Sequence, residues 1–285
     1  MNDNLGGGSE ISANLVFNMV RSVPRISCLP LMTTTAFNLC KSYSHLRCNI
    51  SQVRESQDHG PVNSWDRNSY VSLDPATGKP RVNYSETSIH HNLIIAGGMN
   101  GNGGEFPIDH DDGSASYFDH HNVLCFGPAK QWQGHSKRFE NNLQIFANKG
   151  VGDASRSACI DYEAHDIAYG EAYSSNICIL GNDTKGVCSS SSSEFCEVLK
   201  FRDVCPNGTN DFTAAPLNVV LPHSANNTYY VPGGRGGWGN GKGSCQLDIA
   251  GVRARGAETD SAIHDSAELG DARILTMAKA LLWYM

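Results

Sequence analysis

The stretch Asn142-Leu143-Gln144-Ile145 is one copy of a short pattern that recurs along the chain, an Asn with apolar residues at the first and third positions after it. The copies begin at Asn14, Asn92, Asn122, Asn142, Asn176 and Asn218. Alternate residues of a strand point to the same side, so each copy predicts a short strand with one apolar face, opened by a turn Asn. The second position tolerates Gln144, which predicts that this position faces outward.

The copies are irregularly spaced, and the two nearest, at Asn122 and Asn142, start 20 residues apart. A fixed-length repeat would be regular, whereas loops of any length can leave the corners of a parallel β-helix. Stacked coils would also align the Asn side chains in a hydrogen-bonded ladder. The sequence therefore predicts an all-β parallel β-helix. The alternative is a β-sandwich with Asn-rich turns, which would need tight antiparallel hairpins.

Three segments depart from this pattern. Helix formers and a capping Asp predict a short helix over residues 271–283, which would cap the solenoid within a C-terminal tail of residues 260–285. The Gly-rich residues 231–243 are expected to form a loop. Residues 22–52 hold three cysteines without strand or helix periodicity, and they are interpreted as an anomalous insert, either a retained intron or a surface loop. We expect residues 1–285 to form a single β-helix domain.

Composition limits the function classes. The net charge is −7 and the basic residues are scattered, which excludes a nucleic-acid groove. Because no apolar run has the length of a membrane span, no spanning segment is expected. Ten cysteines and five Asn-x-Ser/Thr sequons predict an extracellular or cell-surface protein, although such sequons also arise by chance in Asn- and Ser-rich sequence. The chain starts without a secretory signal, so we expect that the signal and the first coils are missing from the N-terminus. A monomer is expected.

The segment Pro107-Ile108-Asp109-His110-Asp111-Asp112-Gly113-Ser114 is dense in chemically capable groups. If Ile108 points inward, continued alternation would bury His110 and Asp112, and unpaired buried charge is costly. We therefore expect the chain to leave the coil after Ile108 and to turn at Gly113. Three carboxylates within four residues repel one another, so at least one is expected to have a raised pKa. A raised pKa is the condition for a general acid beside an ionised base or nucleophile, the pair that glycosidic cleavage needs.

The segment Asp58–Arg67 is the second dense region. Asp58 could supply a partner carboxylate, and the Trp65 ring could stack on a sugar. The Arg67 guanidinium could bind a carboxylate or sulfate of an acidic sugar. His59, His110, Lys130 and His135 are the remaining candidates for contact with substrate. The alternative is that the Asp-rich turns are solvated corners and Trp65 is a packing residue.

A metal site is the competing interpretation of these side chains. His90, His91, Asp109, Asp111, Asp112, His120 and His121 offer enough ligands for calcium or zinc. None of the known ligand spacings is present, and the His pairs are adjacent rather than spaced for one face. No metal ligand is therefore predicted, and calcium is the one cofactor left open.

Four phrases, DHGPVNSWDR (58–67), NLIIAGG (92–98), PIDHDDGSASYFDHHNVL (107–124) and GHSKRFENN (134–142), resemble a group of right-handed β-helix proteins in the pectate-lyase-like superfamily. The likeness covers roughly residues 6–19 and 55–180, and then weakly the C-terminal end. It implies a right-handed parallel β-helix, and activity only by association, because the superfamily includes lyases, hydrolases, epimerases and adhesins. Its glycoside hydrolases use carboxylates on the helix face, whereas its lyases rely on Arg or Lys with calcium.

These observations predict a secreted, polysaccharide-active protein with a glycosidase-like mechanism. Asp111 and Asp112 are the first candidates for acid and base or nucleophile, with Asp58 and Asp109 as alternates. A non-catalytic carbohydrate-binding or surface structural protein is the first alternative. A polysaccharide lyase or epimerase is the second, which the acidic face disfavours because Arg67 and Lys130 are its only obvious basic partners.

Overall fold

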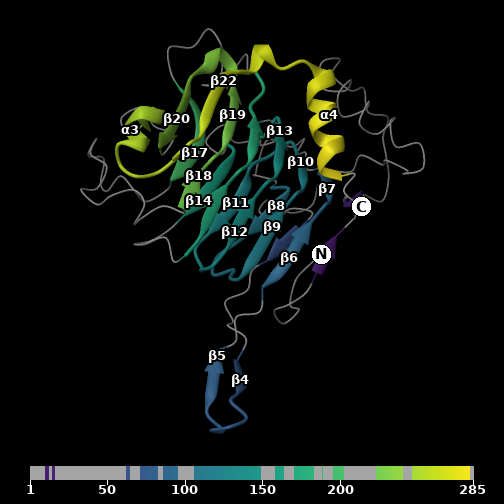
Figure 1. The fold of residues 1–285 in the computed structure, drawn as a ribbon, viewed down its shortest axis with the longest axis vertical. Helices are drawn as coiled ribbons and strands as arrows, with labels where there is room; N and C mark the ends of the chain where they lie inside the picture. Colours follow the sequence, from purple (N-terminus) through teal and green to yellow (C-terminus); the bar gives the residue numbers. More distant parts are fainter. Residues whose placement is uncertain are drawn as a thin grey trace.

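A computed structural model describes residues 10–12, 15–16, 62–64, 71–82, 86–95, 106–148, 158–163, 170–182, 188, 195–201, 223–239 and 246–282. Within these residues, successive strands pass in turn through three stacked sheets, A, B and C (Figure 1). Neighbouring strands of a sheet come from successive coils and are parallel, apart from the final pair of sheet A. The chain is therefore a parallel β-helix, and the β-sandwich alternative is wrong.

Each coil adds one short strand to each sheet. Sheet A contains β3 (Val62–Ser64), β8 (Ile108–His110), β11 (Ala129–Trp132), β14 (Ile160–Glu163), β17 (Cys196–Phe201), β20 (Gly236–Gly239) and the antiparallel β21 (Gln246–Leu247). Sheet B contains β1 (Glu10–Ser12), β6 (Thr87–His90), β9 (Tyr117–His120), β12 (Arg138–Glu140), β15 (Ala172–Ser174) and β18 (His223–Ala225). Sheet C contains β2 (Leu15–Val16), β7 (Leu93–Ile95), β10 (Val123–Cys125), β13 (Leu143–Ile145), β16 (Ile177–Ile179), β19 (Thr228–Val231) and β22 (Ala262–Asp265).

The predicted ladder of Asn side chains lies at the corner between sheets B and C. The ladder residues are Asn92, Asn122, Asn142, Asn176 and Asn227. From Asn122 onward, each Oδ1 accepts hydrogen bonds of 2.9–3.3 Å from the backbone N–H and the side-chain amide of the preceding ladder residue. The prediction is confirmed, except that Asn227 takes the place assigned to Asn218, which lies outside the described residues together with Asn14.

The orientation predicted for the sheet C strands is wrong. The second residue after each ladder Asn, such as Ile94 or Leu124, belongs to the cluster that fills the solenoid. Gln144 occupies the same position and is fully buried. The first and third residues, such as Leu143 and Ile145, form a separate outer cluster. Both faces of sheet C are buried, so the alternation in the sequence could not indicate which face is inside.

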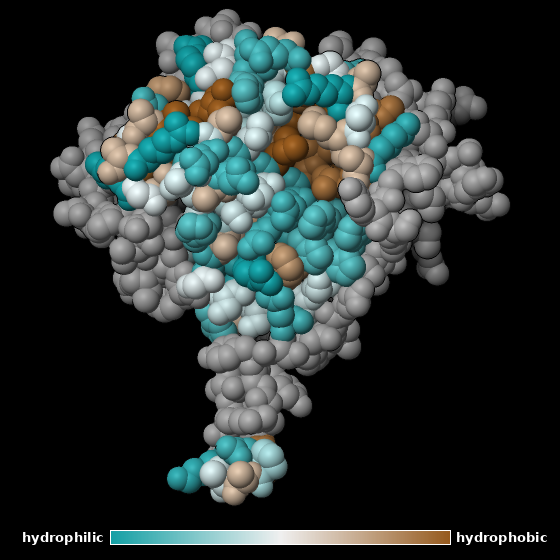
Figure 2. Space-filling view, viewed as in Figure 1, coloured by the Kyte–Doolittle hydropathy of each residue, from teal (hydrophilic) through white to brown (hydrophobic). Residues whose placement is uncertain are grey.

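Two helices cover different parts of the solenoid (Figure 1). The predicted C-terminal helix is present as α4 (Asp271–Leu282), and it packs along the outer face of sheet C against β10 and β13. Ile274 and Ala278 of α4 complete the outer cluster, and Figure 2 shows hydrophobic surface beside this helix. The interior cluster is covered instead by α3 (Ile249–Arg253), through Val252.

The Gly-rich segment 231–243 is not the loop that its composition predicts. Gly236–Gly239 forms β20, and Trp238 is fully buried in the interior cluster. A Cβ at Gly236 would lie 2.7 Å from the Val198 side chain, so the glycine allows β20 to approach β17. A single Trp therefore supplies the core volume that the surrounding glycines cannot.

Other described features lie outside the regular coils. The hairpin of β4 (Val71–Leu73) and β5 (Pro80–Val82) projects from the body, with Leu73 67% exposed (Figure 1). Disulfides join Cys159 to Cys178 and Cys188 to Cys196, which points to an oxidising environment. None of the described helices is long and apolar enough to cross a membrane. Residues 22–52, the predicted insert, lie outside the described residues.

Candidate functional site

A row of polar residues crosses the outer face of sheet A. The parallel register aligns Asn63, Asp109, Lys130 and Asp161 on adjacent strands. Each follows a residue whose side chain enters the interior, such as Ile108 before Asp109, so the row faces outward. The sheet therefore places Lys130 between two aspartates, Asp109 and Asp161.

Lys130 is the centre of this row. Its Nζ lies 3.2 Å from Oδ1 of Asp109 and 2.8 Å from Oδ1 of Asp111. It also stands 3.9 Å from the centroid of the Trp132 ring, within the range of a cation–π contact. Lys130 and Asp109 are fully buried, while the Asp111 side chain is 16% exposed. Asp111 is thus the member of the group that reaches solvent.

The acidic turn begins two residues later than the sequence suggests. β8 continues through His110 before the chain turns, and the Asp111 N–H donates to the Ser64 carbonyl at 2.9 Å. Gly113 has φ of 84° in the turn, as expected for a glycine that reverses the chain. Lys130 offsets the repulsion between Asp109 and Asp111, because it holds both carboxylates within hydrogen-bond reach of one ammonium.

The contacts with Lys130 keep the two carboxylates close together. The bonded oxygens of Asp109 and Asp111 both lie within about 3 Å of the same nitrogen, so they are less than about 6 Å apart. Retaining glycosidases hold their carboxyl pair about 5–5.5 Å apart, and inverting ones hold it farther apart. An upper limit of about 6 Å is compatible with the shorter of these separations.

His110 points away from this group, into the solenoid. Its Nδ1 lies 2.6 Å from Ser64 Oγ, and its Nε2 lies 2.8 Å from Oδ2 of Asp119 on sheet B. Burial of His110 was expected to be too costly, but these partners satisfy both ring nitrogens. The order Ser–His–Asp matches a hydrolytic triad in composition, yet Ser64 is only 1% exposed. We interpret these residues as a polar link between sheets A and B.

A second buried polar group lies where the chain passes from sheet A to sheet B. Lys137 Nζ is 2.5 Å from Oε1 of Glu171, and both residues are nearly inaccessible. Burial lowers the pKa of Lys137 and the charge of Glu171 opposes that change. Burial, together with Glu171, raises the pKa of Tyr162. The charge pair of Lys137 and Glu171 links adjacent coils, and no sequence pattern indicated that these two residues would meet.

The structure brings together only some of the predicted site residues. Asp109, Asp111 and Lys130 converge, and Asp112 lies in the same turn. His135 lies farther along, where its carbonyl accepts from the Ser116 N–H and its Nδ1 is 3.3 Å from Ser136 Oγ. Asp58, His59, Trp65 and Arg67 lie outside the described residues.

Sequence reasoning missed Trp132 and Asp161. Both are in strands of sheet A, and Asp161 belongs to the row that contains Lys130. A weak signal existed, since Ile108-Asp109, Ala129-Lys130 and Ile160-Asp161 each pair an inward apolar residue with an outward charge. The loops that separate these dipeptides differ in length, so only the fold reveals that they are aligned.

The described residues provide no support for a metal site. Among the described residues, no group of three or more His, Cys, Asp or Glu side chains is arranged to hold a metal ion. The two His pairs of the competing metal interpretation gather at the corner between sheets B and C, whereas Asp109 faces outward from sheet A.

Comparisons with models of known families, with curated protein sequences and with solved structures found no match to this chain. The class of protein is thus defined by the fold itself, which is a disulfide-containing parallel β-helix with a buried Asn ladder.

Proposed function

We propose that this chain is a right-handed β-helix protein of the pectate-lyase-like kind and that it hydrolyses a polysaccharide at the outer face of sheet A. The observation that carries the proposal is the contact of Lys130 with both Asp109 and Asp111 beside the Trp132 ring. Glycosidic cleavage uses two neighbouring carboxyl groups, and aromatic rings commonly stack on sugar faces.

The residues have distinct roles in this proposal. Asp111 and Asp112 are the carboxyl groups nearest solvent, and they would act as acid and base or nucleophile. Asp109 would be the partner carboxylate. Lys130 would act as a positioning residue, because it fixes Asp109 and Asp111 at a set distance from each other.

The test is release of reducing sugar from a panel of acidic and neutral glycans. We expect Asp111→Asn to lower the rate at least about 100-fold, because general acid or base catalysis contributes that much or more. Asp260→Asn is the matched control, since Asp260 is exposed and precedes β22. Full activity in both Asp111→Asn and Asp112→Asn would remove the acidic turn from the mechanism. Unsaturated products would instead identify a lyase.

A second candidate, a carbohydrate-binding or structural protein without turnover, is favoured by one observation. Asp109 and Lys130 are fully buried, and buried ion pairs commonly contribute to a unique fold rather than to chemistry. Retention of the protein on an insoluble polysaccharide without product release would support this function over hydrolysis.

A further inference from the structure

Four histidines stack in two columns at the corner between sheets B and C. His90 and His120 end β6 and β9, and their rings are nearly parallel with centroids 4.7 Å apart. His91 and His121 are the corner residues that follow, with φ of 55° and 54° and ring centroids 5.2 Å apart. We call these four residues the histidine cluster.

Each coil joins its two imidazoles by a hydrogen bond. Nδ1 of His90 lies 2.8 Å from Nδ1 of His91, and Nδ1 of His120 lies 2.9 Å from Nδ1 of His121. One nitrogen of each pair must carry the hydrogen and the other must accept it. If both rings of a pair were protonated, two N–H groups would face each other. A pair with both rings charged is therefore incompatible with this hydrogen bond.

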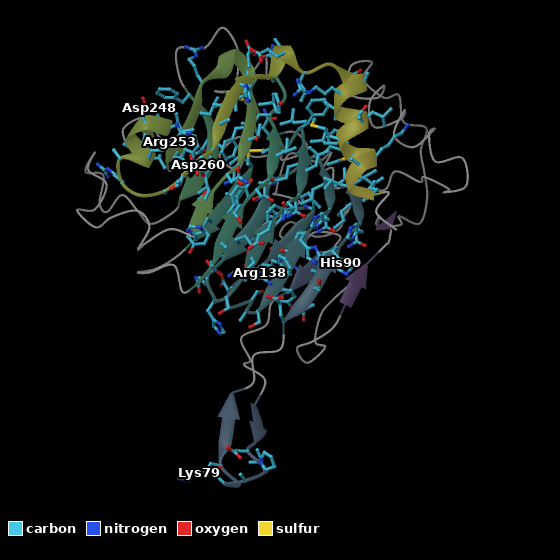
Figure 3. All side chains as sticks on the ribbon, in the orientation of Figure 1. Lys79, His90, Arg138, Asp248, Arg253 and Asp260 are labelled. Carbon is cyan, nitrogen blue, oxygen red and sulfur yellow. A yellow bond between two sulfur atoms is a disulfide. The ribbon has the colours of Figure 1, made fainter. Side chains whose placement is uncertain are left out.

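Aromatic and charged side chains of sheet B surround the histidine cluster. Phe118 stacks on His120 with a centroid distance of 4.1 Å, and Arg138 lies over Phe118. Glu86 holds Arg138 through hydrogen bonds of 2.9–3.0 Å, and Glu140 lies beside His120 in the register of sheet B. Figure 3 labels Arg138 and His90 on the same side of the solenoid. Arg138 and Glu140, the charged residues facing the cluster from β12, are themselves 3.7 Å apart.

The charge state follows from this packing. Burial, the other three histidines and Arg138 hold the pKa of His120 at about 4, and burial with neighbouring histidines lowers the pKa of His91 and His121. An unfolded histidine has a pKa of about 6.5. As the pH falls below 6.5, these three histidines become protonated in the unfolded chain before they do in the folded chain. The folded state therefore loses stability relative to the unfolded state between about pH 6.5 and pH 4.

We propose that the histidine cluster is a pH-dependent switch that fastens the corner between sheets B and C when it is neutral and loosens it when it is protonated. Stacked rings and hydrogen bonds tie together the coils of β6 and β9 in the neutral form. Added protons would place like charges in both columns.

The chain itself provides the substitutions for a test. Ser174 occupies the register position of His90 and His120 on sheet B, two strands beyond β9. Asn141 and Asn226 are the left-handed corner residues of other coils. The variant His90→Ser/His91→Asn/His120→Ser/His121→Asn therefore copies residues that this corner already accepts. His223→Ala is the control, because it removes an exposed histidine of sheet B and copies its register partner Ala172.

The experiment measures thermal unfolding and amide hydrogen exchange of the full chain at pH values between about 7.5 and 4, which span the interval in which stability is lost. Acid also protonates carboxylates, so the measured quantity is the difference between the wild-type chain and the variant. We expect the midpoint to fall about 2–6 °C further in the wild-type chain and in His223→Ala than in the fourfold variant. Exchange, corrected for its intrinsic pH dependence, should rise first in residues 87–95 and 117–125.

Two results would overturn the proposal. If acidification lowers the thermal unfolding midpoint equally in the wild-type chain and in the fourfold variant, the cluster does not control the pH dependence of stability. A midpoint that Zn²⁺ raises at neutral pH in the wild-type chain alone would show that the cluster binds metal rather than protons.

Discussion

The Tyr173 hydroxyl donates a hydrogen bond to Oε1 of Gln144, 2.8 Å away, inside the solenoid. The Gln144 amide in turn donates to the Cys159 carbonyl at 2.5 Å. Burial raises the pKa of Tyr173, so its hydroxyl stays a donor across the accessible pH range. One polar side chain therefore joins all three sheets, since Gln144, Tyr173 and Cys159 lie on or just before strands of sheets C, B and A.

Replacing Gln144 tests this link. We expect Gln144→Leu to lower the free energy of unfolding by about 1–3 kcal/mol, because it leaves the Tyr173 hydroxyl buried without its acceptor. Denaturant unfolding measures the change. Adding Tyr173→Phe should recover part of the loss, since both ends of the bond are then apolar. Unchanged stability in Gln144→Leu would mean that position 144 faces solvent.

The Asn ladder gives a second prediction. Asn122 accepts from Asn92 and donates to the Ile89 carbonyl and to Asn142. We expect Asn122→Ala to cost at least about 2 kcal/mol in the free energy of unfolding, because several buried groups lose partners. Asn141→Ser serves as the control, since Asn141 is exposed and Ser175 fills the same corner position one coil later. Equal effects of the two changes would contradict the ladder.

The Lys130 ion pairs give a third prediction. Lys130→Met would leave the buried Asp109 carboxylate without this counter-ion, so we expect a loss of about 3–5 kcal/mol in the free energy of unfolding. The double variant Lys130→Met/Asp109→Asn removes both charges and should be more stable than Lys130→Met alone. Denaturant unfolding of both variants measures the coupling. Additive losses would show that the two residues do not interact.

The short repeated pattern was sufficient to predict the fold because it combines two local rules. A turn Asn and the alternating residues after it act within a few positions, and the irregular spacing excludes a fixed-length repeat. The direction of each strand face was not predictable, because Leu143 and Ile145 are as buried outside the solenoid as Ile94 and Leu124 are inside it. The outer face is buried because α4, which is far along the chain, packs against it.

The candidate site was partly predictable for a similar reason. Asp109 and Asp111 lie in one dense local segment, and Lys130 belongs to the next strand of the sheet. The partners of His110 come from β3 and β9. Their alignment depends on the lengths of the loops between coils, which carry no pattern of their own. His110 is buried, contrary to the expectation, because Asp119 compensates for its burial. The position of Asp119 beside His110 could not be predicted from the sequence.

Removing apolar contacts of α4 tests its role as the cover of sheet C. Ile274 is 2% exposed and packs in the outer cluster with Val123 and Leu143. We expect Ile274→Ala to cost about 2–4 kcal/mol in the free energy of unfolding, the usual range for truncating a buried aliphatic side chain. Amide exchange in β10 and β13 should rise together with exchange in α4, because the helix contacts both strands. Thr276→Ala, on the exposed side of α4, should leave both measurements nearly unchanged. If Ile274→Ala instead increased exchange within α4 alone, sheet C would be stable without the helix, and α4 would be an appendage rather than part of the core.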